Sequence, residues 1–207
     1  MSRGYHGHYL RIDASTGTAT RVPLPDATLR QYLGGSGLGA RLLLDEQSAV
    51  SDPLAPEAPI VFAFSPLVGS PLTTSAKFAV VSKSPLTNRI NDSLASSGFA
   101  LAGKRCGCDA IVIVGRAPEL SVLVIDDGEV RLEAADDVRG ESCPATEAKL
   151  RARLGHDYRI ASIGPAGERA IRYATISHDG RHAGRGGSGA VLGSKRIKAI
   201  AVRGRQY

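Results

Sequence analysis

The chain has 207 residues, of which 43% are hydrophobic and 22% charged, enough for one sizeable core. No apolar run approaches the roughly 20 residues of a membrane span, and the first residues form no signal-peptide core. We therefore expect a cytoplasmic protein with no membrane partner. The net charge is +6, and no acidic residue follows Asp179. This bias favours an anionic partner, although it is also typical of a solvated face that aids solubility.

The three cysteines are Cys106, Cys108 and Cys143, and an odd number without framework spacing argues against a secreted disulfide scaffold. The pair at 106 and 108 resembles half of a metal site. Zinc or an iron–sulfur cluster needs about four ligands, and the sequence contains no second cysteine pair. We interpret all three as ordinary reduced thiols.

The first elements along the chain are a hairpin over residues 8–22 and a helix with Asp26 as its candidate N-cap. Gly34-Gly35 is expected to end this helix. The stretch 34–39 contains G-x-G-x-G, but it follows a helix rather than a strand, so we expect a link between two helices instead of a dinucleotide-binding loop. Two strands (59–64 and 77–82), a turn-rich stretch (88–98), a short helix and a strand (110–116) follow.

The second part of the chain repeats this order. Asp127-Gly128 predicts a hairpin turn within residues 121–133, and the next helix has Pro144 near its start and Gly155 at its end. Strands at 159–163 and 172–177, a turn-rich stretch (180–189), a short helix and a final strand (199–205) follow. In this alignment Lys77 matches Arg172.

Hairpin, helix, strand, strand, glycine-rich loop, short helix and strand therefore occur twice, in repeats of about 1–116 and 117–207. We predict a single α+β domain over residues 1–207, rich in β-structure and duplicated about a pseudo-twofold axis.

The loop with the clearest sequence signal in the repeat is 181–189, which contains four glycines. Glycines let the backbone approach a ligand, successive N–H groups can form an anion nest, and Arg181 and Arg185 can bind phosphate oxygens. A helix starting near Ser188 would point its N-terminus at the same ligand. The matching stretch 88–98 is small and polar. Two such loops indicate a ligand with two phosphorylated halves, whereas either loop alone is also typical of a flexible surface turn.

At these residues the sequence resembles the N-terminal domain of the aldehyde:ferredoxin oxidoreductase family, essentially over the whole chain. The matching segments are YLGGSGLGARLL (32–43), DPLAPEAPIVFAFSPLVGS (52–70), VVSKSPLT (80–87), CDAIVIVGRA (108–117), ASIGPAG (161–167) and AGRGGSGAVLGSKRIKAIAVRG (183–204).

The resemblance implies tungsten, sometimes molybdenum, held by the dithiolene sulfurs of two pterins whose phosphates are linked by magnesium. It implies a β-rich base on which this cofactor sits. Six residues stand where the family contacts the cofactor, and the glycine-rich loop adds Arg185 to them: Lys77, Leu94, Ser96, Arg181, His182 and Gly184. The main-chain carbonyls of Leu94 and His182 are the candidate magnesium ligands, and magnesium prefers oxygen.

Several residues depart from the family pattern. Lys77 stands where an arginine is expected, which replaces a fork of donors by a point charge. Leu94 and Ser96 replace the usual Asn and Gly, and Ser36 stands where arginine is common. We expect the first half-site to hold its pterin less tightly than the second, whereas main-chain contacts at Leu94 survive the change of side chain.

The resemblance implies that the [4Fe–4S] cysteines and the acid/base residues lie in later domains, so we assign no catalytic residue here. His178 and His182 are expected to be loop residues. The complete enzyme would oxidise a small aldehyde to a carboxylic acid and pass electrons to ferredoxin. This chain is too short to do so alone and would need a partner chain carrying the remaining domains, unless it is a piece of a longer protein.

Two alternatives stay open beside this enzyme part. One is a non-catalytic carrier or insertion module for the pterin cofactor. The other is a basic nucleic-acid-binding module, which we disfavour because aromatic residues make up only 5% of the chain and tryptophan is absent.

Overall fold

The computed structural model describes residues 4–46 and 52–206. The two ends of the predicted range 1–207 therefore lie outside the described residues. The first half contains strands β1 (His8–Asp13), β2 (Thr18–Pro23), β3 (Ile60–Phe64), β4 (Lys77–Lys83), β5 (Ile90–Ser96) and β6 (Ala110–Val114), and helices α1 (Asp26–Tyr32), α2 (Gly35–Asp45) and α3 (Gly98–Arg105).

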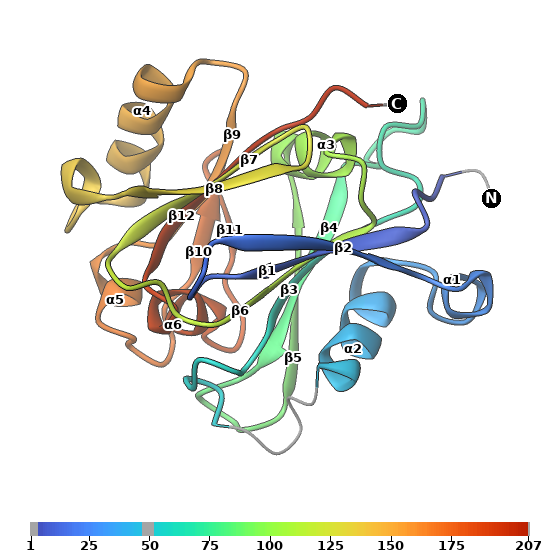
Figure 1. The fold of residues 1–207 in the computed structure, drawn as a ribbon, viewed down its shortest axis with the longest axis horizontal. Helices are drawn as coiled ribbons and strands as arrows, with labels where there is room; N and C mark the ends of the chain where they lie inside the picture. The colour runs from blue at the N-terminus through green and yellow to red at the C-terminus, as the bar shows by residue number, and fades with distance from the viewer. Residues whose placement is uncertain (1–3, 47–51, 207) are drawn as a thin grey trace.

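The second half contains the corresponding series of elements (Figure 1). Its strands are β7 (Ser121–Asp126), β8 (Glu129–Ala134), β9 (Arg159–Ser162), β10 (Ile176–His178), β11 (Arg181–Ala183) and β12 (Ile197–Arg203). Its helices are α4 (Cys143–Leu154), α5 (Pro165–Glu168) and α6 (Ser188–Ser194), with a 3₁₀ turn at Asp136–Val138.

The two six-stranded sheets have the same topology. The first has the order β2-β1-β6-β3-β4-β5, and the second, read from its matching edge, has the order β8-β7-β12-β9-β10-β11. Each sheet has one parallel pair, β1 with β6 and β7 with β12, and antiparallel neighbours elsewhere. The prediction of a duplicated, β-rich α+β fold is therefore confirmed.

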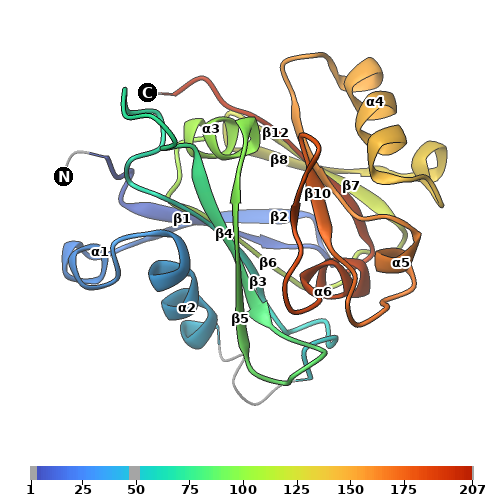
Figure 2. The ribbon, with the colours of Figure 1, turned by 180° about the vertical axis from the view of Figure 1, so that it is seen from behind.

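The main core lies between the two sheets and includes side chains of α3 and α6, such as Phe99 and Leu192. Each of these helices packs against the sheet of the other half: α3 against β9 and β12, and α6 against β3 and β4. Helices α1 and α2 cover the outer face of the first sheet, and α4 covers the outer face of the second (Figures 1 and 2). None of the helices in the described residues is long and apolar enough to cross a membrane.

Several local signals act as the sequence predicts. Asp127 and Gly128 both have positive φ (50° and 90°), which the tight β7–β8 hairpin turn requires. Helix α4 has Pro144 in its first turn and ends at Gly155, whose φ is 117°. The expected N-cap of α1 is wrong, since Asp26 lies inside the first turn and its side chain caps nothing.

The stretch 34–39 does not form a linker. Helix α1 ends at Tyr32, and α2 begins at Gly35, so the glycines form the first turns of the second helix. Gly39 faces Val81 of β4, where an added Cβ would lie 2.5 Å from a methyl carbon. Gly39 is therefore explained by close packing of α2 on the sheet, and not by the link between helices that the sequence predicts.

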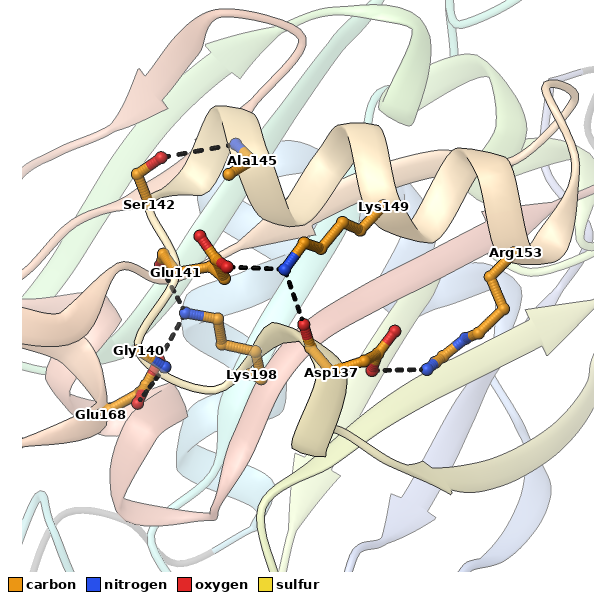
Figure 3. Close-up of polar contacts among 9 residues, drawn as sticks. All are labelled: Asp137, Gly140, Glu141, Ser142, Ala145, Lys149, Arg153, Glu168 and Lys198. Atoms are coloured by element: carbon orange, nitrogen blue, oxygen red, sulfur yellow. Dashed lines mark hydrogen bonds and ion pairs between the residues drawn. The ribbon is translucent and has the colours of Figure 1, made fainter.

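A polar network attaches α4 to the second sheet (Figure 3). Lys198 of β12 is fully buried, donates to the Glu141 carbonyl (2.8 Å) and forms an ion pair with Glu168. The Glu168 carboxylate also accepts the Gly140 N–H at 3.0 Å. Partly exposed ion pairs add to this network, joining Lys149 to Glu141 and Arg153 to Asp137.

Candidate cofactor-binding seam

Strands β5 and β11 are edge strands of different sheets and lie against each other without forming a ladder (Figure 2). We call β5, β11 and the loop 184–187 the seam. Side chains of β5 join its two sides. The Asn91 amide donates to the Arg185 carbonyl (2.9 Å), and the Arg185 N–H donates to the Ser93 hydroxyl (3.3 Å). Polar side chains therefore join the two halves at the seam, although the two edge strands there do not pair with each other as strands.

The main-chain groups of Leu94 and Ser96 point out of the first sheet. The Ser84 N–H donates to the Arg89 carbonyl (2.8 Å). Ser84 and Arg89 are therefore a hydrogen-bonded pair, and they lie one step beyond the last pair of the β4–β5 ladder, Lys83 with Ile90. Bonded and non-bonded pairs alternate along an antiparallel ladder. Leu94 and Ser96 therefore fall in non-bonded pairs, and their N–H and C=O groups point away from β4, towards the seam.

The same reasoning places the main-chain groups of His182. The Ile163 N–H donates to the Lys198 carbonyl (3.0 Å), so Ile163 bonds to β12 and the preceding Ser162 bonds to β10. Ser162 pairs with Ser177, whose main-chain groups therefore point to β9. The partner of Ser177 in β11 is His182, which is left in a non-bonded pair with its carbonyl directed to the seam.

Strand pairing also makes Leu94 and His182 equivalent positions. Leu94 pairs with Ala79, which pairs with Ala63 of β3. In the second half, His182 pairs with Ser177 and then with Ser162 of β9, in the same sheet positions. Two topologically equivalent carbonyls thus face the seam from opposite sides.

This register corrects the alignment of Lys77 with Arg172. Lys77 begins β4, and its equivalent by strand pairing is Thr175, just before β10. Arg172 lies in a turn, where its guanidinium donates to the Pro85 carbonyl (3.4 Å). The alignment was wrong by three residues because short apolar strands match at several shifts.

The predicted cofactor-binding side chains lie along both sides of the seam. Lys77 stands opposite Ser96 in the β4–β5 ladder, and Leu94 is 66% exposed on the same strand. Across the seam, Arg181, His182, Gly184 and Arg185 are all exposed. In the described part of the chain, the charged ends of Lys77, Arg181 and Arg185 have no hydrogen bond or ion pair.

A shallow, mainly apolar cavity of about 360 Å³ opens beside Lys77 and Leu94. Its other walls come from the start of α2 and from the loop after β3, and include Leu33, Ser36, Pro66 and Leu67. The Ser36 hydroxyl donates to Asp92 of β5 (2.6 Å), which ties the start of α2 to the seam. The cavity combines an apolar wall with one cation.

The glycine-rich loop has a different role from the predicted one at most of its glycines. Gly186 has a φ of 63°, and an added Cβ would lie 2.2 Å from the side chain of Asn91. At Gly187, with a φ of 78°, a Cβ would meet the Arg172 carbonyl at 1.9 Å. Gly184 is exposed, and its nearest neighbour would be 3.5 Å away. Gly186 and Gly187 therefore seat the loop on the protein itself, and only Gly184 leaves open space for a ligand.

Two further loop predictions need correction. Helix α6 begins at Ser188 as expected, but Ser188 is buried and the Gly189 N–H donates to the Ala174 carbonyl (2.9 Å), so the helix start does not face a ligand. The turn-rich stretch 88–98 is mostly strand β5. Small polar residues there indicated a turn, but pairing with β4 and contact with the other half fix an extended strand.

Both histidines lie in strands, so their assignment to loops was wrong. His178 is fully buried, packs edge-on against Phe78, and shares a hydrogen bond from Nδ1 with the Ser97 hydroxyl (2.9 Å). Burial lowers the pKa of His178 to about 4, which keeps the ring neutral near pH 7. His178 therefore has a structural role, because it links β10 to the residue that follows β5 beneath the seam.

Cys106 and Cys108 are buried and offer no reactive thiolate. Burial raises the pKa of the Cys106 thiol to about 12 and raises that of Cys108 as well. Among the described residues, no three or more His, Cys, Asp or Glu side chains are grouped to hold a metal ion.

The family model "Aldehyde ferredoxin oxidoreductase, N-terminal domain" matches residues 9–204. The chain belongs to the aldehyde ferredoxin oxidoreductase family. The resemblance found in the sequence is thereby confirmed.

Proteins similar to this chain support the same family assignment. The chain is 40% identical over 203 residues to the tungsten-containing aldehyde ferredoxin oxidoreductase of Pyrococcus furiosus, covering 97% of this chain and 34% of that protein. It is likewise 40% identical over 205 residues to the Pyrococcus horikoshii enzyme of the same name, covering 97% and 33%. An aliphatic sulfonate oxidoreductase, WOR-like subunit, from Pyrococcus furiosus is 31% identical over 217 residues, covering 97% and 34%.

A solved structure has the same fold. One chain of the "Active site complex BamBC of Benzoyl Coenzyme A reductase in complex with 1,5 Dienoyl-CoA" superposes with a TM-score of 0.95 at 33% identity, covering 100% of this chain and 32% of that one. The chain therefore spans about one third of the length of the proteins that it matches.

Proposed function

We propose that this chain is the pterin-cofactor-binding part of a tungsten or molybdenum aldehyde oxidoreductase, with the cofactor seated on the seam. The observation that carries the proposal is the pair of equivalent carbonyls, at Leu94 and His182, that face the seam from opposite sides. Main-chain carbonyls are oxygen ligands of the kind that magnesium accepts while it keeps several waters. A magnesium ion between two pterin phosphates would fit a site of this symmetry.

The surroundings of the seam suit the remaining parts of such a cofactor. Lys77, Arg181 and Arg185 are exposed cations whose charged ends have no partner in the described residues, and they would hold phosphate oxygens. The apolar wall of Leu33, Leu67 and Leu94 would lie against a flat ring. Exposed Gly184 leaves room for close approach of the backbone to the ligand.

The chemistry of the complete enzyme would be divided between parts. The bound metal would supply the two-electron redox chemistry that oxidises an aldehyde to a carboxylic acid, and this chain would hold and orient the cofactor. The [4Fe–4S] cluster and the acid/base residues would come from the remaining domains, on this polypeptide or on a partner chain. Ferredoxin would accept the electrons, and the complex would work in the cytoplasm.

The decisive experiment is metal and pterin analysis of the protein purified anaerobically from its native host with everything that stays bound. The proposal predicts near-stoichiometric tungsten or molybdenum, two pterins per metal and one magnesium, in a preparation that also contains the cysteine-rich remaining domains. Stoichiometric metal without those domains and without aldehyde oxidation would support a cofactor carrier instead. A folded preparation without metal would refute cofactor binding.

A further inference from the structure

The two sides of the seam belong to different sheets, so no ladder sets the distance between the Leu94 and His182 carbonyls. Unpaired strand edges tend either to pair with each other or to separate. Direct pairing of β5 with β11 would consume the carbonyls that face the seam. Something else must therefore hold the edges together while leaving these groups unpaired.

Asn91 occupies the position from which this can be done. Its Nδ2 donates to the Arg185 carbonyl (2.9 Å) and lies 3.4 Å from the Ser188 hydroxyl, both in the other half. The amide lies on the inner side of β5, beside Ser93, whose hydroxyl accepts the Arg185 N–H (3.3 Å). Gly186 is the residue that makes room for it, because any Cβ there would overlap the Asn91 amide.

A second link closes the other end of the seam. Ser97, one residue after β5, shares a hydrogen bond with buried His178 (2.9 Å), which pairs with Arg181 across the turn at Asp179-Gly180. Leu94 and Ser96 on one side, and Arg181 and His182 on the other, lie between these two links. The links therefore bracket the carbonyls at both ends.

We propose that Asn91 is a positioning residue that sets the separation of the two half-sites and so keeps the Leu94 and His182 carbonyls placed to share one bridging cation. The inference rests on the proposed function of the seam. It also explains one glycine of the loop after β11, because Gly186 admits the Asn91 amide from the other half.

The test compares Asn91→Asp and Asn91→Leu in the intact, natively produced protein. Both variants keep nearly the same side-chain shape, and neither can donate to the Arg185 carbonyl. Asn88→Asp is the matched control, since it makes the same chemical change on an exposed turn residue whose described bond is made by its main chain. The measurements are amide hydrogen exchange of residues 184–188 in cofactor-free protein, and magnesium and tungsten or molybdenum content after native purification.

Loss of a hydrogen bond from a partly buried amide predicts about tenfold faster exchange in the loop for both Asn91 variants. It also predicts a lower ratio of magnesium to tungsten or molybdenum, because misplaced carbonyls lose the bridging ion preferentially. General destabilisation would remove both metals together and leave their ratio unchanged.

Unchanged exchange and an unchanged metal ratio in both Asn91 variants would overturn the proposal. A changed ratio in Asn88→Asp as well would also overturn it, because added charge would then explain the effect. Wild-type protein without any cofactor would overturn both this inference and the proposed function, whereas equal cofactor content and an equal metal ratio in wild type and variants would overturn the inference alone.

Discussion

The seam and the polar network around α4 differ in whether their charged side chains have partners within the protein. Lys198 is buried within the network and is neutralised by Glu168, and the exposed charges around it also form ion pairs (Figure 3). Along the seam, Lys77 and Arg181 keep exposed charged ends with no partner in the described residues, beside carbonyls directed away from their sheets. A region that stabilises the fold satisfies its own groups, whereas the exposed, unpaired groups of the seam are free to bind the cofactor that we propose there.

The largest effect expected from this contrast is on stability, at Lys198. Lys198→Ala leaves the Glu168 carboxylate without its buried cation, which predicts a loss of about 3–5 kcal/mol in the free energy of unfolding. Lys149→Ala is the control, because its ion pair with Glu141 is half-exposed and predicts a much smaller loss. Urea unfolding measures both. Similar losses in the two variants would remove the distinction between buried and surface pairs.

The seam should respond in the reverse manner. Lys77→Gln combined with Arg181→Gln removes two cations that stabilise nothing in the protein itself, so unfolding of the cofactor-free protein should be unchanged. Cofactor retention should fall about tenfold or more, since charge-assisted hydrogen bonds to phosphate are among the strong ones. Metal content after dialysis, compared with that of Arg169→Gln as an exposed control, measures the loss. Full retention by the double variant would contradict the assignment of these cations.

Lys195 sharpens the comparison because it is buried like Lys198, but the hydrogen bonds described for its ammonium go to the Pro56 and Gly115 carbonyls rather than to a carboxylate. Burial lowers the pKa of Lys195 from 10.5 to about 7. The unfolded chain therefore binds this proton more tightly than the folded chain. Stability should weaken as pH falls from about 10 to about 7, with a slope of about 1.4 kcal/mol per pH unit, and level off below.

Lys195→Met should flatten this pH dependence, because the variant has no proton to bind at that position. Unfolding in urea at several pH values between 7 and 10 provides the slope for each protein. An identical slope in the variant and the wild type would show that other groups carry the pH dependence.

The smallest effect is expected at Leu94. Leu94→Ala removes an exposed side chain and leaves the main-chain carbonyl in place, so magnesium content should stay within about twofold of wild type. A complete loss of magnesium in this variant would show that the side chain, rather than the backbone, makes the contact.

The sequence predicted the duplication and most elements because hairpin turns, helix ends and apolar strands each have local signals, whereas strands β5 and β11 lie where turn-rich loops were predicted. Asp127-Gly128 and Gly155 are examples that the structure confirms. The register within the repeat had no such signal, so Lys77 was matched with Arg172 instead of with Thr175.

The seam itself was only partly predictable. Lys77 and Leu94 came from a resemblance to the family, Arg181 came from both the resemblance and the glycine-rich loop, and their roles as cofactor ligands stay predictions. Asn91 has no signal in the sequence because its partner is the backbone of Arg185, far away along the chain, and a main-chain acceptor leaves no trace in residue types. The sequence cannot separate the two roles of Gly186, because close approach to a ligand and close approach to Asn91 both require a residue without a side chain.

The central claim is most directly tested by locating the metal in crystals of the natively purified protein by anomalous diffraction at the tungsten or molybdenum edge. The account predicts one strong peak above the seam, with a lighter cation within bonding distance of the Leu94 and His182 carbonyls. A peak away from the seam, or a loaded protein in which both carbonyls contact only solvent, would contradict it.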